Sequence, residues 1–229
     1  MAKIVGESDC TGIIKYSFLK YGIGDVSPDD TISNFKDYYE NDTNRQQPQD
    51  SAIQGKIKNL MAKRYFGAIG EEKVINTLKL LPDTYYILNE VRIRLTKSVR
   101  WKKYCEYVKS AQIDHVIIGD TGIFLIETKN WKEMNLTSVH NSPHKQIDRA
   151  GMLFWLAQKK KFGQPNKTYN LVVTIKDLPK YKYKFVYQLS LKELNNFILS
   201  RKTQLTQSQI NQIKNWLLNL RVINPKYAF

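Results

Sequence analysis

Cysteine is scarce in this 229-residue chain, with only Cys10 and Cys105. Two cysteines exclude a disulfide-rich scaffold and a four-cysteine zinc site. Long apolar runs are also missing, so no stretch approaches the length that a membrane-spanning helix requires. The first ten residues contain no apolar core of the signal-peptide type. We therefore expect a reduced, cytoplasmic protein with no membrane partner.

Acidic side chains are few compared with basic ones. The chain has 21 Asp and Glu against 36 Lys and Arg, a formal net charge of +15. Such an excess makes polyanions the first partners to consider. Hydrophobic residues make up 42% of the chain, which is enough for a packed core and argues against disorder of the whole chain.

The charge is unevenly distributed along the sequence. Residues 1–50 hold five basic and nine acidic side chains, a net charge of −4, whereas residues 51–229 hold 31 and 12, a net charge of +19. The junction at residues 44–51 is polar and contains a proline, as expected of a linker. We therefore expect an acidic N-terminal extension and linker over residues 1–52 and the main domain over residues 53–229. About fifty residues can hardly bury an independent core.

The spacing of apolar residues predicts alternating helices and strands. Helical spacing covers residues 55–81 and 143–162, and two sequences typical of capping boxes, at residues 190–193 and 206–209, predict two further helices. Strand patterns occur at 85–95, 112–118, 123–129, 169–175 and 185–189, with a basic loop over 96–109. This order predicts an α/β or α+β layer fold.

A tight hairpin is predicted at Gly119-Asp120-Thr121-Gly122, because glycine supplies the backbone angles that such turns need. With Asp120 and Thr121 at the centre of the turn, Asp114 lies directly opposite Glu127 on one face of the hairpin. Lys129 is two residues beyond Glu127 and points to the same face, with Gln112 opposite it.

This cluster suggests phosphodiester chemistry. Two facing carboxylates repel one another, and a divalent cation would relieve the repulsion. Mg²⁺ favours one or two carboxylates together with water and phosphate oxygens. Lys129 would then face a phosphate or the attacking water. The alternative is that Asp114 and Glu127 are solvated strand residues, with Lys129 as a surface ion-pair partner.

Three segments resemble the nuclease-related domain, a branch of the PD-(D/E)XK nuclease superfamily: residues 67–71 (GAIGE), 112–119 (QIDHVIIG) and 122–131 (GIFLIETKNW). The resemblance covers about residues 64–175, and Pro143 and Gln146 match a further family element. It implies a restriction-endonuclease-like fold, with a mixed central sheet of about four strands flanked by helices.

The resemblance also implies roles for individual residues. Glu71, Asp114 and Glu127 would bind Mg²⁺, for which Mn²⁺ is an alternative. Lys129 would orient or activate water, and Gln146 would line the site. Among the remaining polar residues, His115 points to the opposite face and is expected to pack there. His140 and His144 are expected to be loop histidines rather than zinc ligands, and Cys105 is expected to be an incidental thiol.

Two basic stretches interleaved with aromatic residues are candidates for nucleic-acid binding, because lysine attracts phosphate and aromatic rings stack on bases. The candidate residues are Arg92, Arg94, Lys97, Arg100, Lys102, Lys103, Lys159, Lys160 and Lys161. The alternative for these stretches is an ordinary solvated face.

Together these observations predict a metal-dependent nuclease, most simply a DNA endonuclease. One alternative is a non-catalytic nucleic-acid-binding or regulatory module that keeps the fold, and another is an RNA nuclease. DNA is a more plausible partner than RNA, and a homodimer or a helicase or other protein partner is compatible with the sequence.

Overall fold

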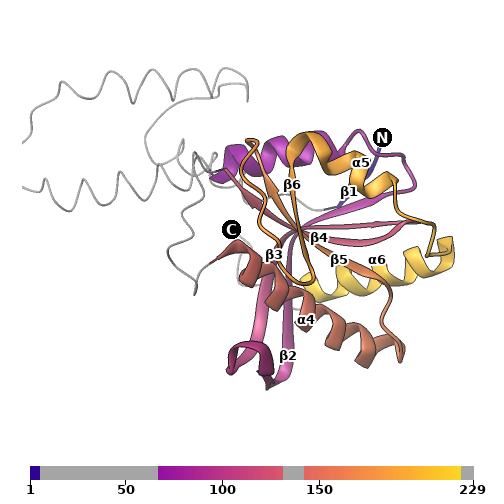
Figure 1. Ribbon diagram of the computed structural model, residues 1–229. Coiled ribbons are helices and arrows are strands. Elements are labelled where there is room, and N and C mark those ends of the chain that lie inside the picture. The colour runs from indigo at the N-terminus through magenta and orange to yellow at the C-terminus, as the bar shows by residue number, and fades with distance from the viewer. Residues whose placement is uncertain (6–66, 131–141, 223–229) are drawn as a thin grey trace, which may run out of the picture. The chain divides into compact units, whose positions relative to one another are not determined.

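The computed structural model describes residues 1–5, 67–130 and 142–222 (Figure 1). The chain divides into two compact units, one of Met1–Ser8 with Ile69–Phe229 and the other of Asp9–Ala68. Nearly all of the second unit lies outside the described residues, as do most of the predicted extension and residues 55–66 of the predicted helix. The fold described below is therefore that of the first unit.

The first unit is built on one mixed sheet, whose strands follow their order in the sequence. In the described residues it has six strands, two more than the expected four or so: β1 (Lys3–Val5), β2 (Tyr86–Trp101), β3 (Glu106–Gly119), β4 (Gly122–Lys129), β5 (Thr168–Thr174) and β6 (Val186–Ser190). The pairs β2–β3 and β3–β4 are antiparallel, and the other neighbouring pairs are parallel. The short strands β1 and β6 form the two edges.

Helices cover both faces of the sheet (Figure 1). On one face lie α4 (Pro143–Phe162) and α6 (Gln207–Val222), and their apolar residues share one buried cluster with the sheet. On the other face lie α5 (Leu194–Leu199) and a helix over residues 67–78, which pack into a second cluster. The predicted α+β layer fold of restriction-endonuclease type is confirmed in its class.

The ends of several helices also follow the sequence prediction. Ser142 caps α4, its Oγ accepting a hydrogen bond from the Lys145 amide at 3.2 Å. At Ser190 the predicted capping box opens the short 3₁₀ helix η4 (Leu191–Glu193) that leads into α5. No helix in the described parts of the chain is long and apolar enough to cross a membrane.

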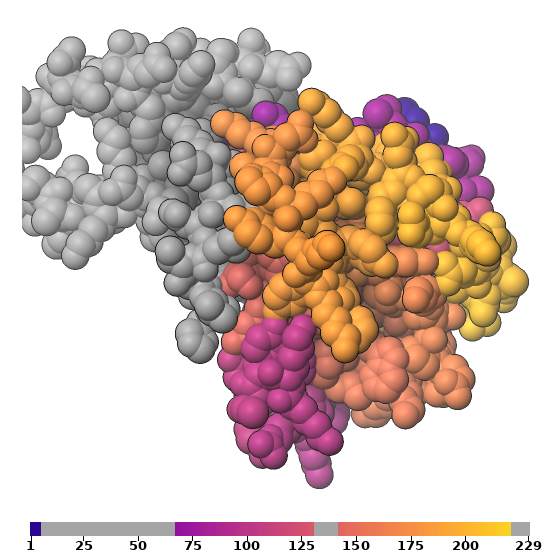
Figure 2. All heavy atoms as spheres, viewed as in Figure 1, coloured from indigo at the N-terminus to yellow at the C-terminus, as the bar shows by residue number. Residues whose placement is uncertain are grey.

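The prediction of a basic loop over residues 96–109 is wrong. Strand β2 continues to Trp101, and β3 already begins at Glu106 after the 3₁₀ helix η2 (Lys102–Tyr104). Thr96, Lys97 and Ser98 are all exposed, but buried side chains recur beyond them, at Trp101 and Val108. Residues 91–113 therefore form a long two-stranded extension, here called the β2–β3 arm, whose tip is magenta in Figure 2.

The tip of the arm is attached to α4 by two ion pairs. Lys103 Nζ lies 2.6 Å from Asp148 Oδ2, and Lys145 Nζ lies 2.5 Å from Glu106 Oε1. The Lys103 ammonium is also 4.5 Å from the centroid of the Tyr183 ring. Figure 2 shows the arm tip beside the orange segment that contains Tyr183. The arm is thereby fixed to the core.

Candidate active site

The predicted hairpin register is confirmed. Pairing between β3 and β4 runs from Gly119 with Gly122 to His115 with Ile126, which places Asp114 and Glu127 one step further. Beyond Ile126, β4 remains paired with β5, whereas β3 remains paired with β2. The two strands therefore diverge at the candidate site.

Because of this divergence, the predicted pairing of Gln112 with Lys129 is wrong. Gln112 pairs with Arg92 on β2, and Lys129 pairs with Thr174 on β5. The prediction assumed that β3 stays paired with β4 as far as the end of β4. Instead, β3 leaves β4 and continues into the arm, where it pairs with β2.

Strands β2 and β3 change faces at Asp114. Up to that point Leu88 and Val116 contact the core on the α4 side; beyond it Val91 and Ile113 do so, although regular alternation would turn both away. Glu90, which lies between the paired rungs on either side, has a positive φ of 53°. The irregularity lies beside the candidate site, as irregular pairing in sheets often does.

Asp114 occupies the gap between the diverging strands. Its Oδ2 accepts a hydrogen bond from the backbone N–H of Thr128 at 2.7 Å. Burial raises the pKa of Asp114, against the opposing effects of that N–H and of the Lys129 ammonium. The carboxylate thus replaces the ladder partner that the Thr128 amide would have had on β3.

Glu127 and Lys129 form the centre of the cluster. Glu127 is 1% exposed, and its Oε1 accepts a hydrogen bond from Lys129 Nζ at 2.6 Å. Its Oε2 is buried with no hydrogen-bond partner among the described residues. Burial, then the charge of Asp114, and to a lesser degree that of Glu71, raise the pKa of Glu127 to about 8.

Lys129 remains protonated in this surrounding. Burial alone would lower its pKa, but the carboxylates of Glu127, Asp114 and Glu71 raise the pKa above its ordinary value. The Lys129 side chain is 23% exposed, so this side chain reaches solvent while its ammonium is bound to Glu127. A cation that is both fixed and accessible can meet an incoming anion.

Glu71 reaches the cluster from the helix over residues 67–78. Gly67 and Gly70 both lie within this helix. A Cβ added at Gly70 would lie 2.8 Å from Asn130 Cβ, so only glycine allows the helix this close to the end of β4. The close approach brings the charge of Glu71 near enough to act on Glu127 and Lys129.

The remaining candidates lie at different distances from this cluster. Gln146 is half-buried in the first turn of α4, on the sheet face to which Glu127 and Lys129 point by alternation. Lys159, Lys160 and Lys161 lie in the last turn of that helix, about 20 Å further along its axis. Those three cations also complement the helix dipole, a structural role that competes with nucleic-acid binding.

The candidate nucleic-acid residues of the arm are mostly on its surface. The exposed ones are Arg92, Arg94, Lys97, Arg100, Lys102 and Lys103. Of these, Lys103 is paired with Asp148 and so is partly neutralised. The alternation of Arg92 and Arg94 with the buried Val91 and Ile93 is as predicted.

The histidines behave differently from one another. His115 is buried as predicted, its Nδ1 lies 2.8 Å from Asn89 Oδ1, and burial lowers its pKa to about 3. His144 is not a loop residue but is buried in the first turn of α4, with Nε2 3.2 Å from Gln188 Oε1. His140 lies outside the described residues. Cys105 is exposed, with a positive φ of 54°.

The donor set fits a divalent cation held partly by water. Glu127 offers a buried oxygen that no described residue hydrogen-bonds, and Asp114 lies close enough to raise the pKa of Glu127. No group of three His, Cys, Asp or Glu side chains within the described ranges is arranged to enclose a metal ion. Mg²⁺ needs no such enclosure, since one or two carboxylates with water and substrate oxygens suffice.

A mixed sheet between two helical layers, with a carboxylate pair and a lysine where two strands diverge, defines an α+β domain of restriction-endonuclease type. Residues 66–175, slightly less than half of the chain, match the family model described as the nuclease-related domain. The matched range contains all five candidate site residues.

Two further comparisons add little about function. An uncharacterized protein of Bacillus anthracis is 39% identical over 70 residues, which are 30% of this chain and 28% of that protein. The match therefore spans less than a third of either protein. No solved structure matches this chain.

Proposed function

We propose that this domain is a metal-dependent nuclease that hydrolyses phosphodiester bonds, with DNA as its substrate. The observation that carries the proposal is the group formed by Asp114, Glu127 and Lys129. In it a buried carboxylate oxygen has no hydrogen-bond partner in the described parts of the chain and lies beside a fixed ammonium. The match of residues 66–175 to the nuclease-related domain supports a nuclease-related role.

Each residue of the candidate site would have a different role. Asp114 and Glu127 would hold Mg²⁺, or Mn²⁺ in its place, and Glu71 would add negative charge. When bound, such an ion polarises a phosphoryl oxygen and lowers the pKa of bound water. Lys129 would orient the attacking water and stabilise charge that develops on the phosphate. Gln146 would line the site.

The preference for a nucleic-acid substrate rests on charge. Residues 51–229 carry a net +19, and the exposed cations of the β2–β3 arm lie on β2 and η2, beside β3, the strand that carries Asp114. Clustered Lys and Arg attract phosphate without reading sequence. DNA and RNA both have a phosphodiester backbone, so RNA is included among the test substrates.

The test uses supercoiled plasmid, linear duplex, single-stranded DNA and RNA, each with Mg²⁺, Mn²⁺ or EDTA. The variants Asp114→Asn and Lys129→Met should each lose roughly 100-fold or more in rate. Matched controls are Asp177→Asn and Lys192→Met, since these two form an exposed ion pair at 3.4 Å. The controls should cleave at the wild-type rate.

The outcomes separate the candidate functions. Full activity in Asp114→Asn or in EDTA would contradict the assigned site. Cleavage confined to RNA would make the protein an RNA nuclease. Tight binding without cleavage of any substrate would favour the non-catalytic module.

A further inference from the structure

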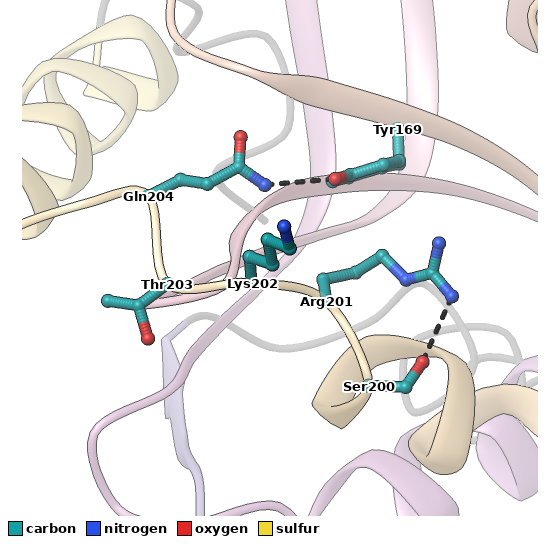
Figure 3. A pocket seen from close by; sticks show the side chains of 6 residues that line it. All are labelled: Tyr169, Ser200, Arg201, Lys202, Thr203 and Gln204. Carbon is teal, nitrogen blue, oxygen red and sulfur yellow. Dashed lines mark hydrogen bonds between the residues drawn. The ribbon is translucent and has the colours of Figure 1, made fainter.

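A second polar site is formed at the connection between α5 and α6, an open pocket of about 570 Å³. Figure 3 shows its lining residues: Tyr169, Ser200, Arg201, Lys202, Thr203 and Gln204. Tyr169 belongs to β5, and the other five form the connection itself. None of them belongs to the cluster around Glu127.

The pocket is cationic. Arg201 and Lys202 extend to the side on which Tyr169 lies (Figure 3), and neither has an acidic partner among the residues described. A third cation is close by, since Lys167 Nζ is 5.6 Å from the centroid of the Tyr169 ring. Two cations in the lining and a third beside Tyr169, none paired with an acid in the described ranges, favour the binding of an anion.

The guanidinium of Arg201 is held in place. Its Nε donates to the Phe197 carbonyl at 3.2 Å and its Nη2 to Ser200 Oγ at 3.0 Å, while the group lies 4.3 Å from the centroid of the Phe197 ring. Two of its nitrogens are thus used for positioning. A pre-positioned cation loses less conformational entropy when it binds a ligand.

The opposite wall is equally well fixed. The Tyr169 hydroxyl accepts a hydrogen bond from Gln204 Nε2 at 2.9 Å, and its ring stacks on Phe124 at 5.1 Å. The backbone amides of Gln204 and Leu205 both donate to the Asp120 carbonyl, at 2.7 and 3.0 Å. The connection is therefore anchored to the β3–β4 turn.

The pocket is separate from the candidate active site. Tyr169 pairs with Phe124, three residues before Glu127 and so about 10 Å away along β4. Tyr169 also packs against the buried cluster on the α5 side of the sheet, whereas Glu127 points to the α4 side by alternation. One phosphate group cannot contact both sites.

We propose that this pocket binds a phosphate group, presented either by a nucleic-acid strand or by a mononucleotide. A fixed guanidinium and an ammonium at one opening match the charge and the acceptor oxygens of a phosphate. The proposal does not depend on cleavage, because it concerns binding at a different place.

The test measures binding by the full chain in EDTA, so that catalysis plays no part. The probes are inorganic phosphate, a 5′-mononucleotide and a single-stranded oligonucleotide, followed by NMR of the amides of residues 200–204 and by fluorescence anisotropy. The variants are Lys202→Gln and Arg201→Gln/Lys202→Gln. The matched control, Lys73→Gln/Lys79→Gln, removes two exposed lysines from outside the pocket.

We expect phosphate to shift the amide signals of residues 200–204 in the wild type and in the control, and not in the double variant. Lys202→Gln guards against misfolding caused by loss of the Arg201 contacts and should weaken binding several-fold. Binding of the mononucleotide would identify a nucleotide pocket, and binding of the oligonucleotide alone would identify a strand contact. Equal affinity of variants and control for all three probes would overturn the proposal.

The salt dependence gives an independent readout. Loss of one phosphate contact should reduce the slope of log affinity against log salt by about 0.7 for a single strand. A protein that binds phosphate here but cleaves nothing would retain this inference and lose the proposed nuclease function.

Discussion

The two carboxyl oxygens of Glu127 have different surroundings. Oε1 is bound by Lys129, and Oε2 is buried without a partner among the described residues. Burial and the charge of Asp114 outweigh the ammonium, so the pKa of Glu127 rises to about 8. Ionisation of this group therefore costs folding free energy when no cation is bound.

This shift predicts a pH-dependent effect of Glu127→Gln on metal-free protein. Between pH 4.5 and about 8 the folded state keeps a proton that the unfolded chain has lost, so the stability contributed by this group falls as the pH rises. At pH 4.5 the melting temperature of the variant should be close to that of the wild type. Towards pH 8 the melting temperature of the variant should exceed that of the wild type by an increasing margin. Calorimetry in EDTA measures both. A variant less stable than wild type at pH 8 would mean that the ion pair with Lys129 dominates.

Glu193 provides a control of opposite sign. Its hydrogen bond with Lys180, together with the Ser190 amide, lowers the pKa of Glu193 to about 2. The stability that it contributes is present above pH 4.5 and is lost as the pH falls towards 2. Glu193→Gln should therefore destabilise the protein at neutral pH, and the difference from wild type should shrink in acid.

At this scale the period of two along a strand was enough to predict that Asp114, Glu127 and Lys129 gather together. The hydrogen bond from the Thr128 amide to Asp114 could not be predicted, because a backbone N–H leaves no signal in the sequence. The contact between His115 and Asn89 joins residues 26 positions apart, and only the register of β2 with β3 brings them together.

Among the elements, the helix over residues 67–78 depends on one glycine. Gly70→Ala places a methyl group 2.8 Å from Asn130 Cβ and should cost about 1–3 kcal/mol of stability while displacing Glu71. Gly67→Ala is the matched control, because a Cβ there has nothing within 4 Å and alanine favours a helix by up to about 1 kcal/mol. Urea unfolding and cleavage rates of the two variants test this difference. Equal stability would show that the helix is not held against β4.

The ion pairs that attach the β2–β3 arm predict an asymmetric response. Lys103→Met leaves Asp148, whose side chain is 9% exposed, as a buried charge without its partner. Asp148→Asn leaves Lys103, which is 37% exposed and can be hydrated. Loss of the lysine should therefore destabilise the protein more, by roughly 1–3 kcal/mol, because the group left behind is desolvated.

The measurement is denaturant unfolding of both single variants and of the double variant. Coupling of at least a few tenths of a kcal/mol in the double-mutant cycle would show a direct interaction. Equal and additive effects would mean that the pair does not hold the arm to α4.

The sequence predicted this level of structure unevenly. Pro143 at the start of α4 and Gly163 after its end delimit that helix at the predicted residues, since both act locally. The prediction of a basic loop over 96–109 is wrong because a high density of charged residues does not require the whole segment to be an exposed loop. Apart from residues 96–98, which are all exposed, the arm has one exposed face and one face on which Trp101 and Val108 are buried.

For the molecule as a whole, the distribution of charge is the dominant property. The chain carries a net charge of +15, although its first fifty residues are acidic. Among the described residues, groups of exposed cations occur on the arm, at the end of α4 and in the connection between β5 and β6, and Lys202 lines the pocket between α5 and α6. These places are far enough apart to contact separate phosphates of one nucleic-acid molecule.

This distribution predicts steeply salt-dependent binding of nucleic acid. Each phosphate neutralised by Lys or Arg releases counterions, so log affinity should fall with log salt at a slope of about −0.9 per phosphate contacted on duplex DNA. Affinity for a short duplex is measured between low and high ionic strength, with Ca²⁺ replacing Mg²⁺ to suppress cleavage.

Replacing Arg92 and Arg94 with Gln should reduce the slope by about two if both contact phosphate. The exposed pair Asp177→Asn/Lys192→Met leaves the net charge unchanged and should leave the slope unchanged. A flat dependence in the wild type would remove nucleic acid from the partners of this protein, whatever its fold.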